Sequence, residues 1–425
     1  MGLISPNLII VFVEYYPRKI DEKLEKWMRR REVLLIRGPR QSGKTTCLLH
    51  LRDMHGGSYV TLEDADALRT FDESPKEFAS RYLDRGGILY LDEVQYSKNA
   101  GKNLKLIYDT YGDSLKLVVT GSGSFDVKVQ VGGYLVGRAA YFELLPLSFG
   151  EFLLWRSPDL SKLFETWRRE VKGFISGSGR IESSPAFQNE FRALLEEFVV
   201  YGGFPAIVKE NDPEFKWELL SNLVRTYLER DVFFFFNIRE MEKFRSLLTY
   251  LSLSAGSMLQ VSSVISDLRM DFRTVENYLS VLSNTYVTML IPPYHTNPVT
   301  ELKKTRKLYF VDTGLRNALL ENYLPLQNRT DGGMLLENFV LNELRDMGFS
   351  PKYWRTTSKA EVDFIIEVDG NPVPIEVKSR GKEQRGFYRF VESYSPKTAL
   401  VFTEGDFGVK SAGKTKILYL PHYFV

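Results

Sequence analysis

The sequence predicts an α/β protein that begins with a parallel sheet and ends with a second α/β region. Three short apolar stretches, at 33–36, 88–91 and 115–119, have the length of buried strands and end in glycine, acidic or hydroxyl residues. A helical pattern follows the first stretch from Thr45. Because parallel strands deliver their last residues to one edge of a sheet, we expect these polar ends to lie together. A helical middle separates this core from the C-terminal region.

The composition is that of a soluble globular protein with several domains. A chain of 425 residues is expected to form two to four domains at about 100–200 residues each. Hydrophobic residues make up 44% of the chain and charged residues 26%. The net charge of +2, from 56 basic and 54 acidic residues, argues against a surface that binds polyanions everywhere. A local basic patch remains compatible with this balance.

Cysteine use and hydropathy predict a cytoplasmic protein with no membrane partner. Cys47 is the single cysteine, which excludes an internal disulfide, and we interpret it as a small buried thiol. The apolar run at 8–13 is far shorter than the roughly 18 residues that a membrane span needs. It also lacks the flanks of a secretion signal.

The loop after the first strand has the full pattern of a phosphate-binding loop, Gly38-x-x-x-x-Gly43-Lys44-Thr45. Its glycines let backbone N–H groups turn toward a phosphate, and the following helix adds partial positive charge. Lys44 is placed to reach the β- and γ-phosphates, and Thr45 to bind Mg²⁺ through its hydroxyl group. The alternative is a strand–helix turn that binds nothing. The predicted ATP-binding residues are Gly38, Pro39, Arg40, Gln41, Ser42, Gly43, Lys44, Thr45 and Thr46.

Carboxylates end the second strand, and hydroxyl groups end the third. Asp92 is positioned to share Mg²⁺ with Thr45, and Glu93 to activate the attacking water. A glutamate there indicates hydrolysis of ATP to ADP and phosphate rather than nucleotide binding alone. Thr120 and Ser122 are candidates to orient the water near the γ-phosphate. The alternatives are an exposed acidic turn and an ordinary Ser/Gly turn.

This order of elements resembles the AAA+ class of P-loop ATPases. The segments LDE-Q and TGSGS, then Gly137-Arg138 and 144–152 (LLPLSFGEF), look like the archaeal and bacterial AAA+ ATPases that carry a C-terminal domain of unknown function. The resemblance implies an ATPase core over 1–155 and a homo-oligomer. It also implies an arginine that reaches the γ-phosphate from a neighbouring subunit. Arg138 is the candidate for this catalytic role, and a structural arginine on a strand edge is the alternative.

The middle of the chain predicts a helical region over 156–245 and a winged-helix domain over 246–330. Three helices, at 245–254, 261–268 and 271–282, precede two strands that form a hairpin, at 286–291 and 307–311. Basic residues gather at the wing, where such proteins track the phosphate backbone of DNA. The alternative is a fold that packs or contacts protein. The predicted nucleic-acid contacts are Arg273, Lys303, Lys304, Arg306 and Lys307.

Residues 331–425 form the last predicted domain, which carries a cluster of carboxylates and a lysine. Asp369-Gly370 predicts a hairpin turn between two alternating strands. Asp363, Glu376 and Lys378 on these strands, with Glu337 on a preceding helix, resemble the motif of the PD-(D/E)XK nuclease fold. The resemblance implies a second divalent metal, Mg²⁺ or Mn²⁺. The alternatives are a fold kept without cleavage and a surface hairpin with a salt bridge.

These features leave three functions open. The first is an oligomeric ATPase that couples ATP turnover to the engagement of DNA. The second is a nucleotide-gated switch whose appended domains bind proteins. The third is a metal-dependent nuclease regulated by ATP.

Overall fold

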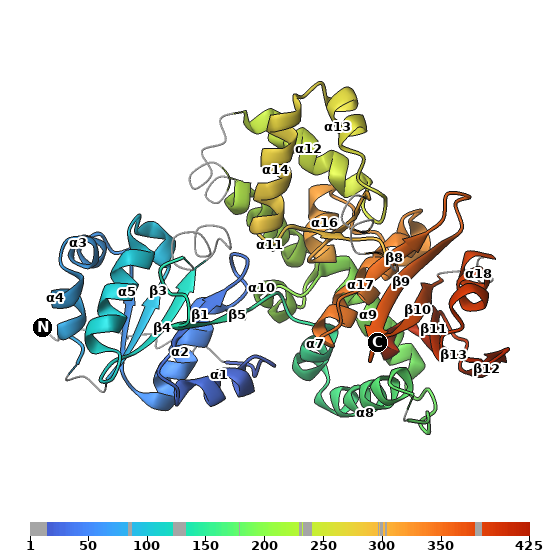
Figure 1. The fold of residues 1–425 in the computed structure, drawn as a ribbon, viewed down its shortest axis with the longest axis horizontal. Helices are drawn as coiled ribbons and strands as arrows, with labels where there is room; N and C mark the ends of the chain where they lie inside the picture. The colour runs from blue at the N-terminus through green and yellow to red at the C-terminus, as the bar shows by residue number, and fades with distance from the viewer. Residues whose placement is uncertain are drawn as a thin grey trace, which may run out of the picture. The chain divides into compact units, whose positions relative to one another are not determined.

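A computed structural model describes residues 15–83, 87–121, 133–177, 179–228, 232, 240–295, 297, 301, 304–378 and 385–425. The chain divides into two compact units, drawn in Figure 1: Met1–Gly38 with Gly43–Leu144, and Pro39–Ser42 with Leu145–Val425. Two predicted site residues, Ser122 and Lys303, lie outside the described residues. In the described part of the chain, no helix is both long and apolar enough to cross a bilayer.

The first unit contains the predicted parallel sheet. Its described strands run in the order β2-β3-β4-β1-β5, and every neighbouring pair is parallel. The three apolar stretches of the sequence are confirmed as β1, β3 and β4. Because β4 lies between β1 and β3, its last residues stand between the phosphate loop and the acid pair. The strand bounds are β1 (Val33–Arg37), β2 (Ser58–Thr61), β3 (Ile88–Asp92), β4 (Lys116–Gly121) and β5 (Ala139–Glu143).

Helices cover both faces of this sheet. Alternate residues of β1 point to opposite faces: Val33 and Leu35 pack with α3, α4 and α5, while Leu34 and Ile36 pack with α1 and α2. This two-sided burial explains why β1 is apolar throughout. Cys47, on α2, is buried as predicted. The helix bounds are α1 (Asp21–Met28), α2 (Lys44–His55), α3 (Ala65–Glu73), α4 (Pro75–Ser80) and α5 (Ala100–Tyr111), with the 3₁₀ turn η1 at Val94–Tyr96.

The second unit contains the predicted three helices and hairpin. The helices are α12 (Met241–Leu253), α13 (Val261–Leu268) and α14 (Phe272–Asn284), and their positions confirm the prediction. Strands β6 (Thr288–Ile291) and β7 (Lys307–Phe310) pair in antiparallel fashion. Arg269 ends α13 in the left-handed region, at φ 51°, and so turns the chain into α14.

A second sheet fills the C-terminal part of this unit. Its described strands run in the order β12-β13-β11-β10-β9-β8, with β10, β11 and β13 parallel to one another. The Asp369-Gly370 turn between β9 and β10 is confirmed; both residues have positive φ, 50° and 73°, as a two-residue hairpin turn requires. The elements are α16 (Thr313–Leu319), η4 (Leu326–Asn328), α17 (Gly332–Asp346), β8 (Lys352–Arg355), β9 (Glu361–Val368), β10 (Asn371–Val377), α18 (Arg385–Tyr394), β11 (Thr398–Thr403), β12 (Gly408–Ala412), β13 (Thr415–Pro421) and η5 (His422–Phe424).

The helices that follow the first unit share one core with this C-terminal sheet. Trp167 stacks on Phe424 with ring centroids 4.0 Å apart, and Phe149 meets Phe339 edge-on at 5.5 Å. The core also contains Ile291 and Tyr309, so it joins residues from all four predicted domains (1–155, 156–245, 246–330 and 331–425), and the division of the chain into those four remains a prediction. The helices of this core are α7 (Phe149–Arg156), α8 (Pro158–Ile175), α9 (Gln188–Tyr201) and α10 (Pro205–Lys209); the next helix, α11 (Pro213–Thr226), packs in a separate core with α12 and α14.

The Tyr201–Pro205 turn is fixed by a buried carboxylate. Asp312 caps α16 and accepts hydrogen bonds from the backbone N–H groups of Gly203, at 2.7 Å, and Leu315, at 2.8 Å. A Cβ atom on Gly202 would lie 2.2 Å from Asp312 Oδ1, so glycine is required there. Burial raises the pKa of Asp312 to about 6, although backbone N–H groups lower it.

We predict that Asp312→Asn changes how stability depends on pH. The folded-state pKa lies above the unfolded value, so the contribution of this carboxyl to stability is present at low pH and is lost as pH rises through about 6. The free energy of unfolding of the wild type, relative to that of Asp312→Asn, should fall by about 2 kcal/mol between pH 4 and pH 7. Urea unfolding of both proteins across this range measures the difference. A difference that is constant with pH would contradict the prediction.

Candidate functional site

The phosphate loop joins β1 to α2 through left-handed backbone. Gly43, at the N-cap of α2, has φ 99°, and Gln41 has φ 61°. Glycine tolerates such angles without the steric cost that a Cβ atom brings. Lys44 is 4% exposed, and its Nζ donates a hydrogen bond to the carbonyl oxygen of Gly38 at 3.1 Å. The ammonium group is therefore held over the loop into which a polyphosphate would fit. All the predicted ATP-binding residues lie on this loop and the first turn of α2.

Asp92 joins the loop to the neighbouring strands. Its Oδ2 accepts a hydrogen bond from Thr45 Oγ1 at 2.7 Å, and its Oδ1 accepts one from Thr120 Oγ1. Asp92 is only 2% exposed and Thr120 is fully buried. The strand order explains the meeting, because β4 places Thr120 between β1 and β3. A hydroxyl and a carboxylate in direct contact have the chemistry of a Mg²⁺ site beside a phosphate, so Thr45 and Asp92 fit this ion.

Glu93 lies in a strained backbone position next to Asp92. It has φ 56° and ψ 46°, a left-handed conformation that costs a non-glycine residue roughly 1–3 kcal/mol. Its backbone N–H donates to Asp92 Oδ1 at 3.1 Å and to Thr120 Oγ1 at 3.3 Å. These two hydrogen bonds offset part of the cost of the left-handed backbone. Glu93 Oε2 accepts a hydrogen bond from Gln95 Nε2.

Two polar residues of this site received no role in the sequence analysis. Gln95 was visible in the LDE-Q segment, but only the 3₁₀ turn η1 brings its amide onto Glu93. Tyr59 donates a hydrogen bond to Asp92 Oδ2 at 2.8 Å because β2 runs beside β3, with Thr61 opposite Asp92. Burial and then the charge of Asp92 raise the pKa of Tyr59, which keeps this hydroxyl a donor. No local sequence signal indicates the pairing of β2 with β3.

Arg138 does not lie at the phosphate loop of its own chain. It precedes β5, and its carbonyl oxygen accepts a hydrogen bond from the N–H of Val33, at the amino end of β1. The phosphate loop follows the opposite end of that strand. Arg138 Nε donates to Asp109 Oδ1 at 2.8 Å, and its side chain is 35% exposed. A role at the site of a neighbouring copy remains a prediction.

The four predicted nuclease-like residues come together at the C-terminal sheet. Lys378 Nζ lies 2.7 Å from Glu376 Oε1, and Asp363 Oδ2 accepts a hydrogen bond from the N–H of Val377 at 2.8 Å. Glu337 faces them from α17. Burial, followed by the charges of Glu337 and Glu376, raises the pKa of Asp363 well above its usual value. The alternation along β10 thus brings distant carboxylates into one cluster.

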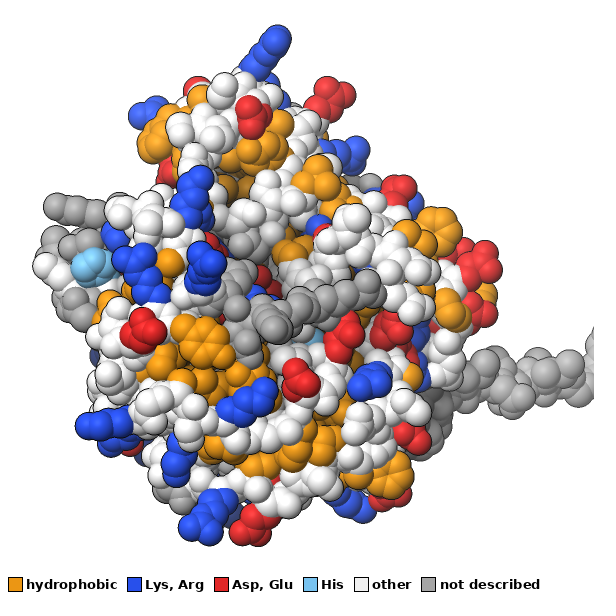
Figure 2. All heavy atoms as spheres, turned by 90° about the vertical axis from the view of Figure 1, so that its right-hand side faces the viewer, with side chains coloured by type: hydrophobic (Ala, Val, Ile, Leu, Met, Phe, Trp, Pro, Cys, Tyr) orange, Lys and Arg blue, Asp and Glu red, His pale blue; other side chains and the backbone are white. Residues whose placement is uncertain are grey.

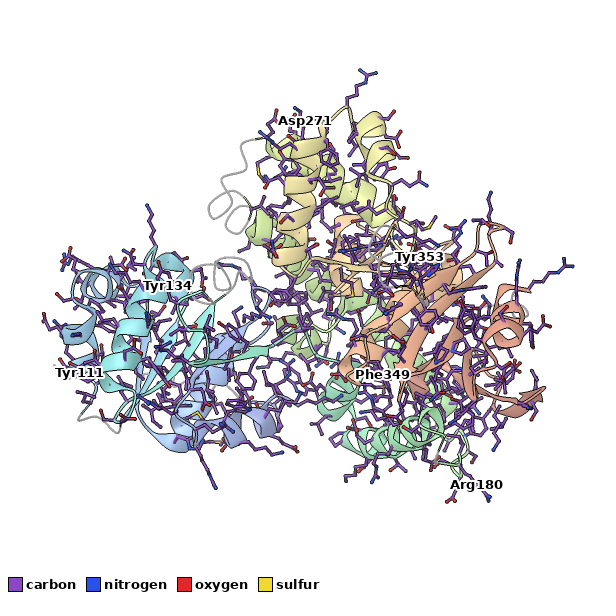
Figure 3. All side chains as sticks on the ribbon, viewed as in Figure 1. Tyr111, Tyr134, Arg180, Asp271, Phe349 and Tyr353 are labelled. Carbon is purple, nitrogen blue, oxygen red and sulfur yellow. The ribbon has the colours of Figure 1, made fainter. Side chains whose placement is uncertain are left out.

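The structure corrects the predicted position of Lys307. This residue is 3% exposed and belongs to β7 rather than to the tip of the wing. Its Nζ lies 2.5 Å from Glu361 Oε1 and 3.4 Å from Glu337 Oε1. The β6–β7 hairpin meets the C-terminal sheet near Tyr353, labelled in Figure 3, whose ring centre is 5.6 Å from the same ammonium group. Pairing with β6 withdraws Lys307 from the solvent, so it offers no free charge to DNA.

The carboxylate cluster does not fit a divalent metal ion as it is built. Lys307 pairs with both Glu337 and Glu361, Arg355 pairs with Glu361, and Lys378 pairs with Glu376. Within the described ranges, no group of three or more histidine, cysteine, aspartate or glutamate residues is arranged to hold a metal. The predicted second Mg²⁺ or Mn²⁺ therefore finds no such ligand group in the described part of the chain, and we derive no reaction step from it.

Of the remaining predicted nucleic-acid contacts, the three that the structure describes, Arg273, Lys304 and Arg306, are exposed. Arg273 lies in the first turn of α14, next to Asp271, which is labelled in Figure 3 and caps this helix by accepting the N–H of Thr274 at 3.0 Å. Lys304 and Arg306 precede β7 and are exposed. On the face shown in Figure 2, basic and acidic side chains are interspersed rather than gathered into one basic field.

Three families match successive parts of the chain. Residues 30–153 match the family described as "AAA domain". Residues 192–325 match "Domain of unknown function (DUF8612)", and residues 332–423 match "Domain of unknown function (DUF4143)".

Relatives of similar layout occur in archaea and bacteria. The uncharacterized protein MJ1544 of Methanocaldococcus jannaschii is 26% identical over 360 residues, which cover 82% of this chain and 75% of that protein. The uncharacterized protein Rv2008c of Mycobacterium tuberculosis is 25% identical over 375 residues, which cover 85% and 73%.

One solved structure with a likeness to this chain is a signal transduction ATPase with numerous domains and a tetratricopeptide repeat sensor, PH0952 from Pyrococcus horikoshii. It is 12% identical, covers 78% of this chain and has a TM-score of 0.27. The chain spans 45% of that protein's length, and so low a score carries no argument. The AAA match, by contrast, agrees with the phosphate loop, the acid pair and the parallel sheet, and the first unit is therefore an α/β core of the AAA-like P-loop type.

Proposed function

We propose that this protein is an oligomeric ATPase that hydrolyses Mg·ATP and couples turnover to the engagement of DNA. The observation that supports hydrolysis most strongly is the meeting of Thr45, Asp92 and Thr120 through direct hydrogen bonds. It joins three separate segments at the carboxyl edge of the sheet, where parallel α/β proteins bind ligands. The backbone of Glu93 is tied into the same network.

Each residue has a distinct role in the proposed reaction. Lys44 binds the β- and γ-phosphate oxygens, while Thr45 and Asp92 would hold Mg²⁺, which neutralises charge on those phosphates. Glu93 accepts a proton from water as the water oxygen bonds to the γ-phosphorus. The bond between that phosphorus and the β–γ bridging oxygen breaks, and ADP leaves. Gln95 must release Glu93 before this step, because the two side chains are hydrogen-bonded in the structure described here.

The oligomer is part of this proposal. A transition state that spreads negative charge over the γ-phosphate gains from an added arginine, and in such enzymes a neighbouring protein can supply it. Arg138 is partly exposed and lies away from its own phosphate loop, as such a residue must. A nucleotide-gated switch that binds protein instead of DNA is the second candidate, favoured by the mixed charges on the face shown in Figure 2.

A salt titration of DNA binding separates the two candidates. Each lysine or arginine that neutralises a phosphate contributes about 0.9 to the slope of log affinity against log salt. We expect Lys304→Gln with Arg306→Gln to weaken binding to duplex DNA and to reduce this slope by about 2. A matched pair at other exposed lysines, Lys397→Gln with Lys414→Gln, should leave the slope unchanged. ATP turnover should rise with DNA in the wild type. If DNA neither binds nor changes the rate of ATP turnover, the protein switch is favoured.

A further inference from the structure

A cavity of about 500 Å³ opens at the edge of the C-terminal sheet where its parallel strands end. Glu404 follows β11 and His422 follows β13, and both line the cavity together with the first turn of α17. Ligands of α/β proteins bind beyond the carboxyl ends of parallel strands, and proteins bind small molecules in cavities of about 300–1,000 Å³. All residues that line the cavity belong to the second unit, and none of them belongs to the phosphate loop motif.

Hydrogen bonds between different elements fix the walls of this cavity. Arg192 Nη2, on α9, donates to the carbonyl oxygen of Glu404 at 3.0 Å. The N–H of Leu326, in η4, donates to Glu196 Oε1 at 3.0 Å. These bonds tie α9 to both the β11 end and η4. The two hydrogen bonds therefore connect three of the segments that surround the cavity.

The α17 end of the cavity is positively charged. Gly332 and Gly333 begin the helix and line the cavity; the first N–H groups of a helix have no acceptors within it, and the N-cap residue makes no hydrogen bond to them through its side chain. The preceding residue, Asp331, does not cap them through its side chain, because Arg316 and Arg329 bind its carboxylate.

This ion-pair group carries a surplus of one positive charge. The side chains of Arg316 and Arg329 are 3% and 1% exposed, and Asp331 is the single carboxylate paired with them in the described part of the chain. Although burial raises the pKa of Asp331, hydrogen bonds from the two arginines lower it to about 2, so the carboxylate stays ionised. A buried positive surplus beside a helix N-terminus favours an anion in the adjoining cavity.

The strand end of the cavity carries an unused hydrogen-bond acceptor. His422 is 3% exposed; its ring hydrogen-bonds to the backbone of Lys378, and its Nε2 has no hydrogen-bond partner among the described residues. Burial lowers the pKa of His422 to about 4, so the ring is neutral near pH 7. A neutral ring that donates through its other nitrogen presents a lone pair at Nε2. Leaving a buried acceptor without a donor is unfavourable, and a ligand hydroxyl group would satisfy it.

We propose that this cavity binds a hydroxylated monophosphate of the size of a nucleoside monophosphate. The phosphate lies against the first turn of α17 and Arg192, and the sugar hydroxyl groups donate to His422 Nε2 and Glu196. The carboxylates of Glu196 and Glu404 disfavour further negative charge, so a monophosphate binds more tightly than a triphosphate. The site therefore selects against the nucleotide that the phosphate loop takes.

Calorimetric titration of the full chain carrying Lys44→Ala tests this proposal, because that change removes binding to the phosphate loop. The probes are inorganic phosphate, ribose 5-phosphate, AMP and ATP. We expect ribose 5-phosphate and AMP to bind at least about 10-fold more tightly than inorganic phosphate or ATP. Absence of ribose 5-phosphate and AMP binding at millimolar concentration, or equal affinity for inorganic phosphate and ribose 5-phosphate, would overturn the proposal.

Variants in the same Lys44→Ala chain locate the site. Arg192→Ala and His422→Phe should each weaken the binding of ribose 5-phosphate at least about 10-fold. Arg192 and Thr330 line the cavity and are exposed, so Arg192→Ala and Thr330→Val are expected to fold. They therefore test binding at this cavity even if the substitution of the buried His422 prevents folding. Arg225→Ala, at an exposed arginine on α11, is the control and should bind like its parent. Unchanged affinity in Arg192→Ala and Thr330→Val would exclude this cavity. None of these outcomes depends on ATP hydrolysis.

Discussion

Replacing Glu93 with glutamine is expected to lower the rate of ATP hydrolysis about 10²–10³-fold while ATP binding stays within about twofold. Glutamine keeps the size of the side chain and loses the carboxylate that accepts the proton of water. The nucleotide contacts come from the phosphate loop, Thr45 and Asp92, which this change does not touch. Phosphate release under saturating Mg·ATP and calorimetric titration with ATP measure the two effects separately.

A matched change at an exposed glutamate controls for the loss of charge. Glu77, on α4, has a side chain 63% exposed and pairs with Arg81, the residue that follows this helix. Glu77→Gln should hydrolyse ATP at the wild-type rate. If Glu93→Gln also retained that rate, Glu93 would not be the base, and the left-handed backbone at φ 56° would need another explanation.

The second large effect is expected at Lys307. Lys307→Met keeps the approximate length of the side chain but leaves Glu337, whose side chain is 18% exposed, without its cation; Glu361 keeps its ion pair with Arg355. Removing one partner of a buried ion pair costs about 3–5 kcal/mol because the other charge stays desolvated. We therefore expect the second unit of Lys307→Met to unfold at a clearly lower urea concentration than that of the wild type. The fluorescence of the tryptophans in this unit measures the unfolding.

Two comparisons make the Lys307 result specific. Lys304→Met removes a charge from an exposed position three residues earlier and should change the free energy of unfolding by less than about 0.5 kcal/mol. Mn²⁺ should leave the unfolding of the nucleotide-free wild type unchanged, because Lys307 and Lys378 already pair with the glutamates of the cluster. Stabilisation by Mn²⁺ that disappears in Asp363→Ala would show that a metal does bind the cluster.

The phosphate loop and the strand ends were predictable because their signals are local. Strand β1, its glycine loop and the lysine at the start of α2 are contiguous, so the same few residues specify both the turn and its charge. The hairpin at Asp369-Gly370 was predictable for the same reason: its turn requires two positive φ angles, which these residue types tolerate.

Contacts between distant segments were not predictable in this way. Lys307 belongs to the run KKTRK, which resembles a solvated basic loop, and its burial follows only from the pairing of β7 with β6 and from Glu337 and Glu361. The stacking of Trp167 on Phe424 joins helix α8 to the last residues of the chain. The sequence shows that Trp167 and Phe424 are apolar, but it does not show that they pack against each other. The same limit applies to Tyr59, whose hydroxyl reaches Asp92 through the order of the strands.

Equilibrium binding of a non-hydrolysable Mg·ATP analogue, compared between the wild type and Lys44→Ala, tests the nucleotide site most directly. We predict saturable binding to the wild type with one analogue per chain at the phosphate loop. Lys44→Ala should weaken it at least about 10-fold, because the ammonium group held over the loop at Gly38 is lost. Equal binding by the two proteins, or no binding by the wild type, would contradict the assignment of this edge of the sheet to ATP.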